Sequence, residues 1–261
     1  MAQGSTKRFF KFIIFLTIFN ISSCFITRKL IFIPVGKARL PDYKGKLIKV
    51  KNKDEEVIGY FSKNGKKLIV GFHGQHGSIH SFSAFGNRFY NSGFSVLLVE
   101  YPGYGLASKS SVSESNIYNS SEIIIKEIQK EYGFSLTNTI LMGYSLGTGV
   151  AVEMAKRNLG EKVLLFAPYT SIPAVAEDRY IRFLPHMLIW DRFDSLKKAK
   201  SISKKVIIVH GEKDTVVPYY MGEKLNDEFP NSTLVSLPGY THNLYPILKS
   251  KTFEKIIKLI K

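Results

Sequence analysis

The residues that, by their chemistry and spacing, most clearly suggest catalysis surround one serine, Ser145. Its context is Gly143-Tyr-Ser-Leu-Gly147, with a glycine two positions before the serine and another two positions after it. The mostly apolar residues 139–142 predict a buried strand, and residues 148–157 predict a helix. A strand, a tight turn and a helix in this order form a nucleophile elbow, which presents the serine hydroxyl in an exposed position. The pattern therefore predicts Ser145 as a nucleophile.

Acyl transfer by a serine needs hydrogen-bond donors for the oxyanion that develops on the attacked carbonyl group. The backbone N–H of Leu146 begins the predicted helix, where the helix dipole also favours negative charge. A second donor is expected from the glycine-rich loop of residues 71–77. We assign it to the backbone N–H of Gln75, with His76 as the alternative.

An activated serine also needs a general base and an acid that orients it. His242 follows the predicted strand 233–237, and Asp214 lies in the loop after the predicted strand 205–210. Because functional groups gather beyond the carboxyl ends of parallel strands, both side chains could reach Ser145. We expect His242 to act as the base and Asp214 to fix its tautomer. The alternatives are a surface-loop histidine and a turn aspartate.

Three histidines near the glycine-rich loop suggest a rival interpretation. His73, His76 and His80 have a spacing that could hold a metal ion. Zinc sites usually add a cysteine or a carboxylate, and neither stands nearby, while Gly74 and Gly77 require a turn. We therefore expect neither a metal nor a cofactor.

The segment 172–200 is too apolar for an ordinary exposed loop. It is either a helix packed on the sheet or a short lid over an acyl pocket, and it is too short for a large cap domain. We favour a modest, membrane-facing pocket for fatty-acyl esters. The expected pocket residues, from this segment and from the loops around Ser145, are His76, Tyr144, Tyr169, Met187 and Trp190.

Short apolar runs alternate with helical patterns along most of the chain. Predicted strands cover residues 46–51, 57–61, 67–72, 95–100, 138–142, 162–166, 205–210 and 233–237, the first two as a hairpin at a sheet edge. Predicted helices cover residues 81–91, 114–132 and 145–158, followed by Gly93, Gly133 and Gly160 as candidate C-caps. This alternation predicts an α/β fold, with a mostly parallel sheet and helices on both faces.

Composition limits the class of protein. With 261 residues and 44% hydrophobic residues, the chain can form one sizeable core. The net charge of +16 fits either a solvated, lysine-rich surface or attraction to anionic lipid. No basic cluster interleaved with aromatic residues forms a recognisable nucleic-acid module, so we expect no nucleic-acid partner. A single cysteine excludes an internal disulfide and a cysteine zinc site.

The N-terminus accounts for that cysteine. Lys7, Arg8 and Lys11 precede an apolar run, residues 12–21, with the length of a signal-peptide core. The run ends in Ile-Ser-Ser-Cys24, which resembles the lipobox of bacterial lipoproteins, so we expect Cys24 to be lipidated. The alternatives are an uncleaved signal anchor, which would give a single-pass membrane protein, and a buried structural cysteine.

These features predict three regions in the chain. Residues 1–23 are a signal peptide or anchor, residues 24–45 are a membrane-proximal connector without helical period, and residues 46–261 are the catalytic domain. We expect a membrane-anchored protein held outside the cytoplasm, with no prediction of its oligomeric state.

From about residue 28 onward the chain resembles the α/β-hydrolases, in particular small membrane-tethered members of the depalmitoylase-like and lysophospholipase-like type. The resemblance is carried, in order, by Phe32-Ile-Pro34 with Leu40-Pro41, His73-Gly74, Tyr101-Pro-Gly-Tyr-Gly105, Ala167-Pro-Tyr-Thr-Ser171, Asp191-Arg-Phe-Asp-Ser195, His210-Gly-Glu-Lys-Asp214 and Gly239-Tyr-Thr-His-Asn243. It implies the α/β-hydrolase fold, and the order of serine, aspartate and histidine is the order of its catalytic triad.

This sequence departs from that branch at several positions. Gln75 and His76 replace an asparagine and a small residue, Tyr144 stands where an arginine is common, and Glu100 and Pro102 replace an aspartate and an arginine. None of these changes removes a catalytic group, but they alter the pocket.

The resemblance implies a serine hydrolase that cleaves acyl esters or thioesters through an acyl-enzyme intermediate. A serine peptidase or amidase with the same triad is the alternative, and a non-catalytic surface-binding module is the second.

Overall fold

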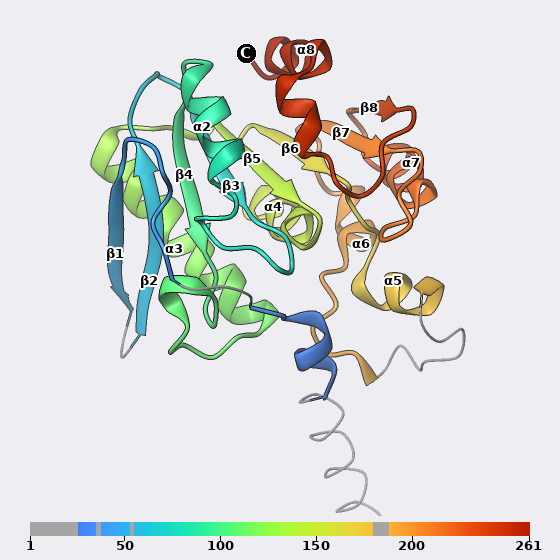
Figure 1. The fold of residues 1–261 in the computed structure, drawn as a ribbon, viewed down its shortest axis with the longest axis horizontal. Helices are drawn as coiled ribbons and strands as arrows, with labels where there is room; N and C mark the ends of the chain where they lie inside the picture. Colours follow the sequence, from blue (N-terminus) through green and yellow to red (C-terminus); the bar gives the residue numbers. More distant parts are fainter. Residues whose placement is uncertain (1–25, 35–37, 53–54, 180–187) are drawn as a thin grey trace, which may run out of the picture.

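The fold is built on one mixed sheet. The computed structural model describes residues 26–34, 38–52, 55–179 and 188–261, and in these residues eight strands form a sheet of order β1-β2-β4-β3-β5-β6-β7-β8 (Figure 1). β1 pairs antiparallel with β2, and β2 pairs antiparallel with β4. All pairs from β4 to β8 are parallel, which confirms the predicted α/β class with a hairpin at one edge.

The strands lie where the apolar runs predicted them. Their bounds are β1 (Lys46–Asn52), β2 (Glu55–Ser62), β3 (Leu68–Phe72), β4 (Ser95–Glu100), β5 (Thr139–Tyr144), β6 (Lys162–Phe166), β7 (Lys205–Gly211) and β8 (Ser232–Leu237). Every residue of the central strands β3, β4 and β5 is buried. Strands covered on both faces need apolar side chains at odd and even positions, which explains their continuous apolar runs.

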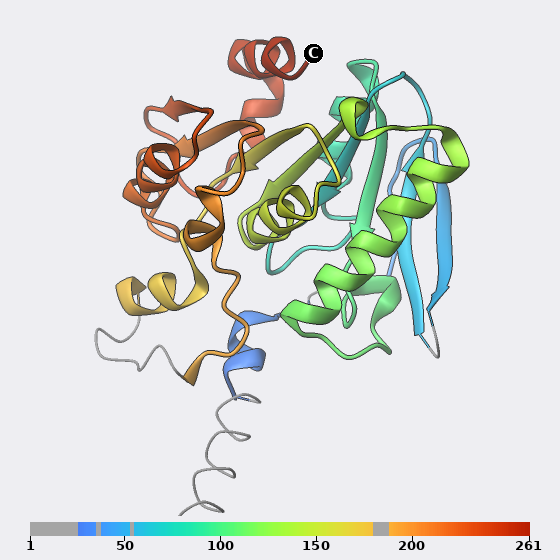
Figure 2. The same ribbon diagram turned by 180° about the vertical axis from the view of Figure 1, so that it is seen from behind.

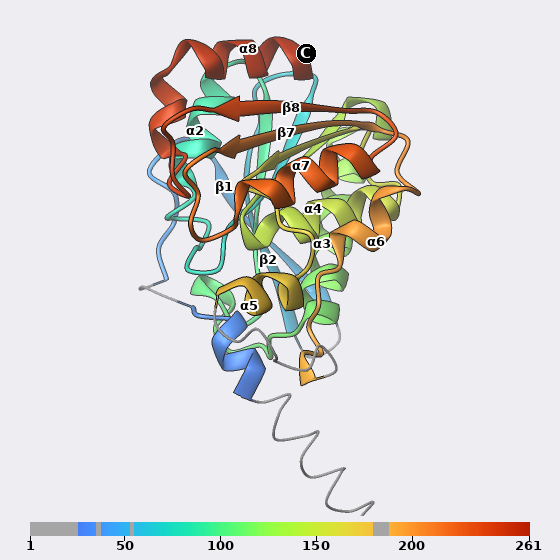
Figure 3. The same ribbon diagram turned by 90° about the vertical axis from the view of Figure 1, so that its right-hand side faces the viewer.

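Helices cover both faces of the sheet, as Figure 3 shows in a view along its edge. On one face lie α2 (Ser83–Asn91) and α8 (Lys251–Ile260), and on the other lie α3 (Glu114–Tyr132), α4 (Leu146–Lys156), α6 (Ser195–Ala199) and α7 (Tyr219–Glu228). α3 and α4 lie across the sheet in Figure 2. The structure also has a short helix, α5 (Ile172–Arg179), and the 3-10 turns Gly105–Ala107, Leu136–Asn138 and Tyr245–Lys249.

The glycine signals for helix ends are correct in two cases and wrong in one. Gly133 closes α3 in the left-handed conformation, with φ of 72°, and Gly93 follows α2 with φ of 89°. Gly160 is not the cap of α4, because the helix ends earlier, at Lys156. The left-handed residue there is Asn158, with φ of 61°. Asparagine tolerates this conformation better than most side chains, which moves the helix end away from the glycine.

The connector before the first strand is partly helical, contrary to the sequence-based expectation. Residues 26–31 form a short helix that lies beside the loops at one end of the sheet (Figure 1). Six residues are too few to show a clear helical period in the sequence. A helix this short is also unstable on its own, so contacts with the rest of the protein must stabilise it. No helix in the described part of the chain is long and apolar enough to cross a bilayer.

Candidate active site

The chain turns sharply at Ser145, between β5 and α4. Ser145 has φ of 51° and ψ of −118°, a conformation that few residues other than glycine adopt. A side chain at Gly143 would overlap the carbonyl oxygen of Gly147, and a side chain at Gly147 would overlap that of Phe72, at the end of β3. The two glycines are therefore required by close packing, and they hold the strained serine at the carboxyl end of the sheet.

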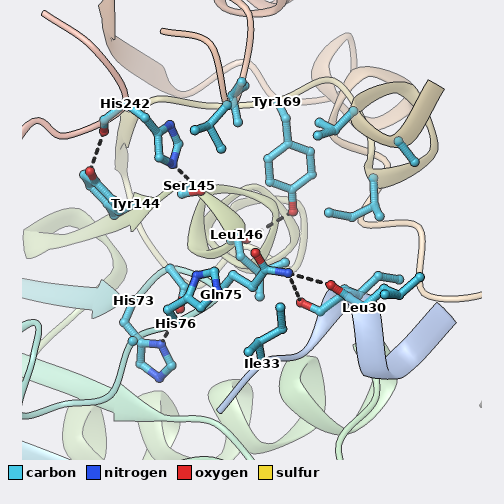
Figure 4. A pocket seen from close by; sticks show the side chains of 18 of the residues that line it. Leu30, Ile33, His73, Gln75, His76, Tyr144, Ser145, Leu146, Tyr169 and His242 are labelled. Atoms are coloured by element: carbon cyan, nitrogen blue, oxygen red, sulfur yellow. Dashed lines mark hydrogen bonds between the residues drawn. The ribbon is translucent and has the colours of Figure 1, made fainter. Parts of the chain in front are cut away.

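The three residues predicted as a triad are connected through His242, which lies in hydrogen-bonding distance of both Ser145 and Asp214. His242 Nε2 is 3.0 Å from Ser145 Oγ, and His242 Nδ1 is 2.8 Å from Asp214 Oδ2 (Figure 4 shows the histidine and the serine). Asp214 is buried, whereas the His242 side chain is 21% exposed on the pocket side. This arrangement can carry a proton from the serine hydroxyl to the imidazole.

Asp214 is held as a carboxylate by its surroundings. Its Oδ1 accepts the backbone N–H groups of Val216 and Val217 at 2.8 and 2.9 Å. Burial raises the pKa of Asp214, but hydrogen bonds from His210 and His242 and from the backbone outweigh burial, so the pKa lies well below its usual value. The ionised carboxylate can therefore orient His242 throughout the neutral pH range.

His210 is a contact of Asp214 that the sequence analysis did not identify. Its ring is fully buried, with Nε2 2.9 Å from the Val217 carbonyl oxygen and 3.4 Å from Asp214 Oδ2. A carbonyl oxygen only accepts, so Nε2 carries the proton. Only its place in the His-Gly-Glu-Lys-Asp214 motif could have signalled this role.

The loop that follows β3 lies beside the serine. Gly74 is so close that a side chain there would lie 3.5 Å from Ser145 Cβ, and a turn closes where Gly77 N–H donates to the Gly74 carbonyl oxygen at 2.9 Å. The backbone of Gln75 follows directly, and Leu146 begins α4 on the other side of the pocket floor. One predicted donor thus comes from the loop beside Ser145, and the other from the first residue of α4.

Two buried side chains, His73 and Glu100, lie against each other beside this loop. His73 Nε2 lies 3.3 Å from Glu100 Oε1, and both side chains are 1% exposed. The Tyr101 hydroxyl donates to the His73 carbonyl oxygen at 2.8 Å, and Glu100 accepts the backbone N–H groups of Ile79 and Leu106. His73 Nδ1 also lies 2.9 Å from the Gly74 carbonyl oxygen, so His73 is part of the packing that supports the loop. Within the described residues no group of three metal-ligating side chains could hold an ion.

A pocket of about 1230 Å³ opens in front of Ser145. Of the residues predicted to line it, His76, Tyr144 and Tyr169 do so. Trp190 does not: its side chain is 56% exposed outside the lining, and the neighbouring Leu188 and Ile189 line the pocket instead. Met187 and Cys24 lie outside the described residues.

Several walls of the pocket were not predicted residue by residue. The first turns of α5 contribute Ile172, Val175 and Ala176, and the region after β7 contributes Val216 and Val217. A third set comes from the N-terminal segment: Ile26, Thr27, Leu30, Ile31 and Ile33. The periodicity of single segments cannot reveal this pocket, because its apolar residues come from distant parts of the chain.

Two of the predicted pocket residues also bind the backbone of the site. The Tyr144 hydroxyl donates to the His242 carbonyl oxygen at 2.6 Å and accepts the Leu244 N–H at 3.3 Å (Figure 4). The buried Tyr169 hydroxyl donates to the Leu146 carbonyl oxygen at 3.1 Å. Tyr144 therefore positions the loop that carries the histidine.

Comparisons with known proteins agree with this geometry. Residues 63–192 match the family described as serine aminopeptidase, S33, and residues 190–258 match the family described as TAP-like protein. A protein of Acanthamoeba polyphaga mimivirus named as an alpha/beta hydrolase is 32% identical over 199 residues, 75% of this chain and 73% of the relative.

More distant similarities point to the same fold. Alpha/beta hydrolase domain-containing protein 17B of Homo sapiens is 30% identical over 165 residues, 62% of this chain and 54% of the relative. An esterase of Pyrococcus furiosus superposes with a TM-score of 0.70 at 16% identity, covering 88% of this chain and 97% of that structure. With the elbow, the sheet order and these matches in place, the chain belongs to the α/β-hydrolase family.

Proposed function

We propose that this hydrolase is a serine hydrolase that cleaves acyl esters or thioesters through a Ser145–His242–Asp214 triad. The observation that carries the proposal is the continuous chain of short contacts, 3.0 Å from serine to imidazole and 2.8 Å from imidazole to carboxylate. A binding module would give no reason to join these three groups at the floor of a pocket.

In the proposed reaction, His242 Nε2 removes the Ser145 proton as Oγ attacks the acyl carbonyl carbon. The N–H groups of Leu146 and Gln75 stabilise the oxyanion of the tetrahedral intermediate. His242 then protonates the leaving alcohol or thiol, which leaves an acyl group on Ser145. A water molecule, deprotonated by His242, releases the carboxylic acid and restores the serine.

The pocket favours an apolar acyl group. Its walls are mostly apolar, with aliphatic and aromatic side chains, and the described residues that line it include one formally charged side chain, Arg179, and no carboxylate. Apolar walls with few polar groups suit a hydrocarbon chain, which binds mainly by leaving water. The esterase name of the Pyrococcus furiosus neighbour is consistent with ester cleavage.

Amide cleavage is the second candidate, because one matching family is described as a serine aminopeptidase. An aminopeptidase must bind the positively charged α-amino group of its substrate, which usually takes a carboxylate in the pocket. The described lining offers no carboxylate. Ester or thioester cleavage is therefore the better supported reaction.

Membrane attachment through the N-terminus is part of the same proposal. A lipid on Cys24, or an uncleaved anchor, would hold the domain outside the cytoplasm, close to acylated substrates. It is supported by the lipobox-like sequence and by the net charge of +16.

Labelling with a fluorophosphonate probe tests the nucleophile. The full-length protein is expected to be labelled, Ser145→Ala is expected to remain unlabelled, and Ser201→Ala, a surface change beyond α6, is expected to behave as wild type. Parallel assays with an octanoyl ester and an aminoacyl anilide then separate the two reactions. Faster turnover of the anilide would sink the ester proposal, and labelling that survives in Ser145→Ala would sink the triad.

A further inference from the structure

One wall of the pocket comes from the segment that precedes the catalytic domain. Residues of the helix 26–31 and the following Ile33 line the pocket together with Ser145 and His242. Figure 4 shows Leu30 and Ile33 on the side of the pocket opposite His242. Leu30 is 67% and Ile33 is 36% exposed, so their side chains border the open part of the pocket, where a substrate chain would enter.

The side chain of Gln75 attaches this wall to the glycine-rich loop of residues 71–77, which carries the proposed oxyanion donor. Its amide nitrogen donates to the carbonyl oxygens of Leu30 and Ile31 at 2.7 and 2.8 Å (Figure 4). Carbonyl groups in the last turn of a helix lack partners within the helix, so this amide satisfies two of them. An amide on a shorter side chain, such as asparagine, would not reach both from the same backbone position.

A second set of contacts holds the outer side of the same segment. Arg28 Nε lies 2.7 Å from Asp191 Oδ2, a carboxylate that also accepts the Glu114 N–H at 2.7 Å. The ring of Phe32 packs edge-on against Phe193 at 6.0 Å between centroids. The wall is thus a fixed part of the fold, attached on one side to residues 191–193 and on the other to the loop beside Ser145.

We propose that residues 26–33 determine which acyl chains the hydrolase accepts, and that Gln75 is a positioning residue that aligns this wall with the oxyanion donor. The inference rests on the proposed ester hydrolysis, which it deepens by naming the specificity element. In this proposal Gln75 performs two tasks through different atoms: its backbone N–H is the proposed oxyanion donor, and its side chain holds the wall that receives the acyl chain. Movement of the wall would therefore alter both chain selection and rate.

A larger side chain in the wall tests whether residues 26–33 select the acyl chain. Turnover of acetyl, octanoyl and dodecanoyl esters would be measured for the full-length protein and for Ile33→Trp. The indole would occupy space that a long chain needs, so kcat/KM for the dodecanoyl ester is expected to fall about tenfold while the acetyl ester changes less than about threefold. Leu40→Trp is the matched control, because Leu40 precedes the same domain and is 46% exposed but does not line the pocket.

Removing the amide tests the positioning residue. Gln75→Met keeps the backbone N–H and the side-chain length but loses both hydrogen bonds to the helix. The dodecanoyl ester is expected to lose about tenfold in kcat/KM, and the acetyl ester is expected to lose kcat with little change in KM. Gln75→Lys, whose ammonium group can donate to the same carbonyl oxygens, is expected to restore most of the rate.

The outcomes separate the inference from the proposed function. Unchanged chain selection in Ile33→Trp, with full activity of the wild type, would overturn the specificity wall and leave ester hydrolysis standing. Equal losses in Gln75→Met and Gln75→Lys at unchanged Tm would overturn the role of the amide. No turnover of any ester and no fluorophosphonate labelling by folded wild-type protein would remove the proposed function, and the inference with it.

Discussion

Tyr144 directly precedes Ser145, the proposed nucleophile, but its hydroxyl contacts the loop that carries His242, the proposed base. It bridges the carbonyl group of His242 and the N–H of Leu244, and so holds the loop from which the imidazole projects. A group that positions the base should affect the chemical step more than substrate binding.

Tyr144→Phe is therefore expected to lower kcat about tenfold, with KM changed less than about twofold. Steady-state kinetics on a short-chain ester would measure this. The ring remains to line the pocket, so a large rise in KM with normal kcat would instead assign Tyr144 to substrate binding.

Asp214 links catalysis to stability, because its pKa is lowered in the folded protein. A group with a depressed folded-state pKa stabilises the fold above its unfolded value, about 3.9 for aspartate, and this stabilisation is lost as the pH falls through the folded value. The asparagine in Asp214→Asn can still accept the Val216 and Val217 N–H groups, but its amide would favour the wrong tautomer of His242.

Asp214→Asn is thus expected to lose about four orders of magnitude in kcat at neutral pH. It should also unfold at a lower temperature than wild type at pH 7, and the difference in Tm should narrow below about pH 4. Thermal unfolding from pH 3 to pH 7 would test the second expectation, which a constant difference in Tm would contradict.

At the scale of elements, the elbow depends on how closely α4 approaches β3. A methyl group at Gly147 would collide with the carbonyl oxygen of Phe72, which is backbone and has little freedom to move. The backbone movement needed to relieve this collision would also displace Ser145 relative to His242, since Gly147 lies only two residues from Ser145.

Gly147→Ala is accordingly expected to lower Tm by several degrees and to abolish fluorophosphonate labelling. Gly133→Ala serves as the control. Gly133 has open space around it, so this change should cost only the strain of a left-handed alanine, about 1–2 kcal/mol, with labelling intact. Normal labelling of Gly147→Ala would mean that the elbow tolerates a wider gap from β3.

The elements that the sequence predicted well are those whose signal is local. The apolar runs of β4 and β6 and the amphipathic helix α3 with Gly133 were predicted to the residue. The three residues of the proposed triad could be located in the sequence because each follows a strand end, and the structure brings them into contact.

The parts that the sequence did not reveal depend on contacts between distant residues. The helix of residues 26–31 lacks a period of its own and is held by Gln75 and Asp191. The contact of His210 with Asp214 and the exclusion of Trp190 from the pocket likewise follow from packing, which no single segment encodes.

At the scale of the whole molecule, the positive charge is the property most open to measurement. Cleavage before a lipidated Cys24 would remove Lys7, Arg8 and Lys11, so the anchored chain would carry a net charge of 16 − 3 = +13. Each basic residue near an anionic membrane surface adds attraction that salt screens. We expect the protein to sediment with vesicles that contain anionic lipid, and to be partly released when the salt concentration rises from about 100 to about 500 mM. Equal binding to neutral vesicles would show that charge contributes nothing beyond the anchor.

The pairing of Arg28 with Asp191 spans 163 residues, and this separation has a consequence for folding. During synthesis the helix of residues 26–31 emerges long before its partners, and closing so long a loop is slow compared with local structure formation. The histidine at position 242 also arrives near the end. The nascent chain therefore acquires the Asp191 attachment of this helix, and later the proposed base, only after Ser145 has been made, so a chain that ends before residue 242 holds the serine without its proposed base.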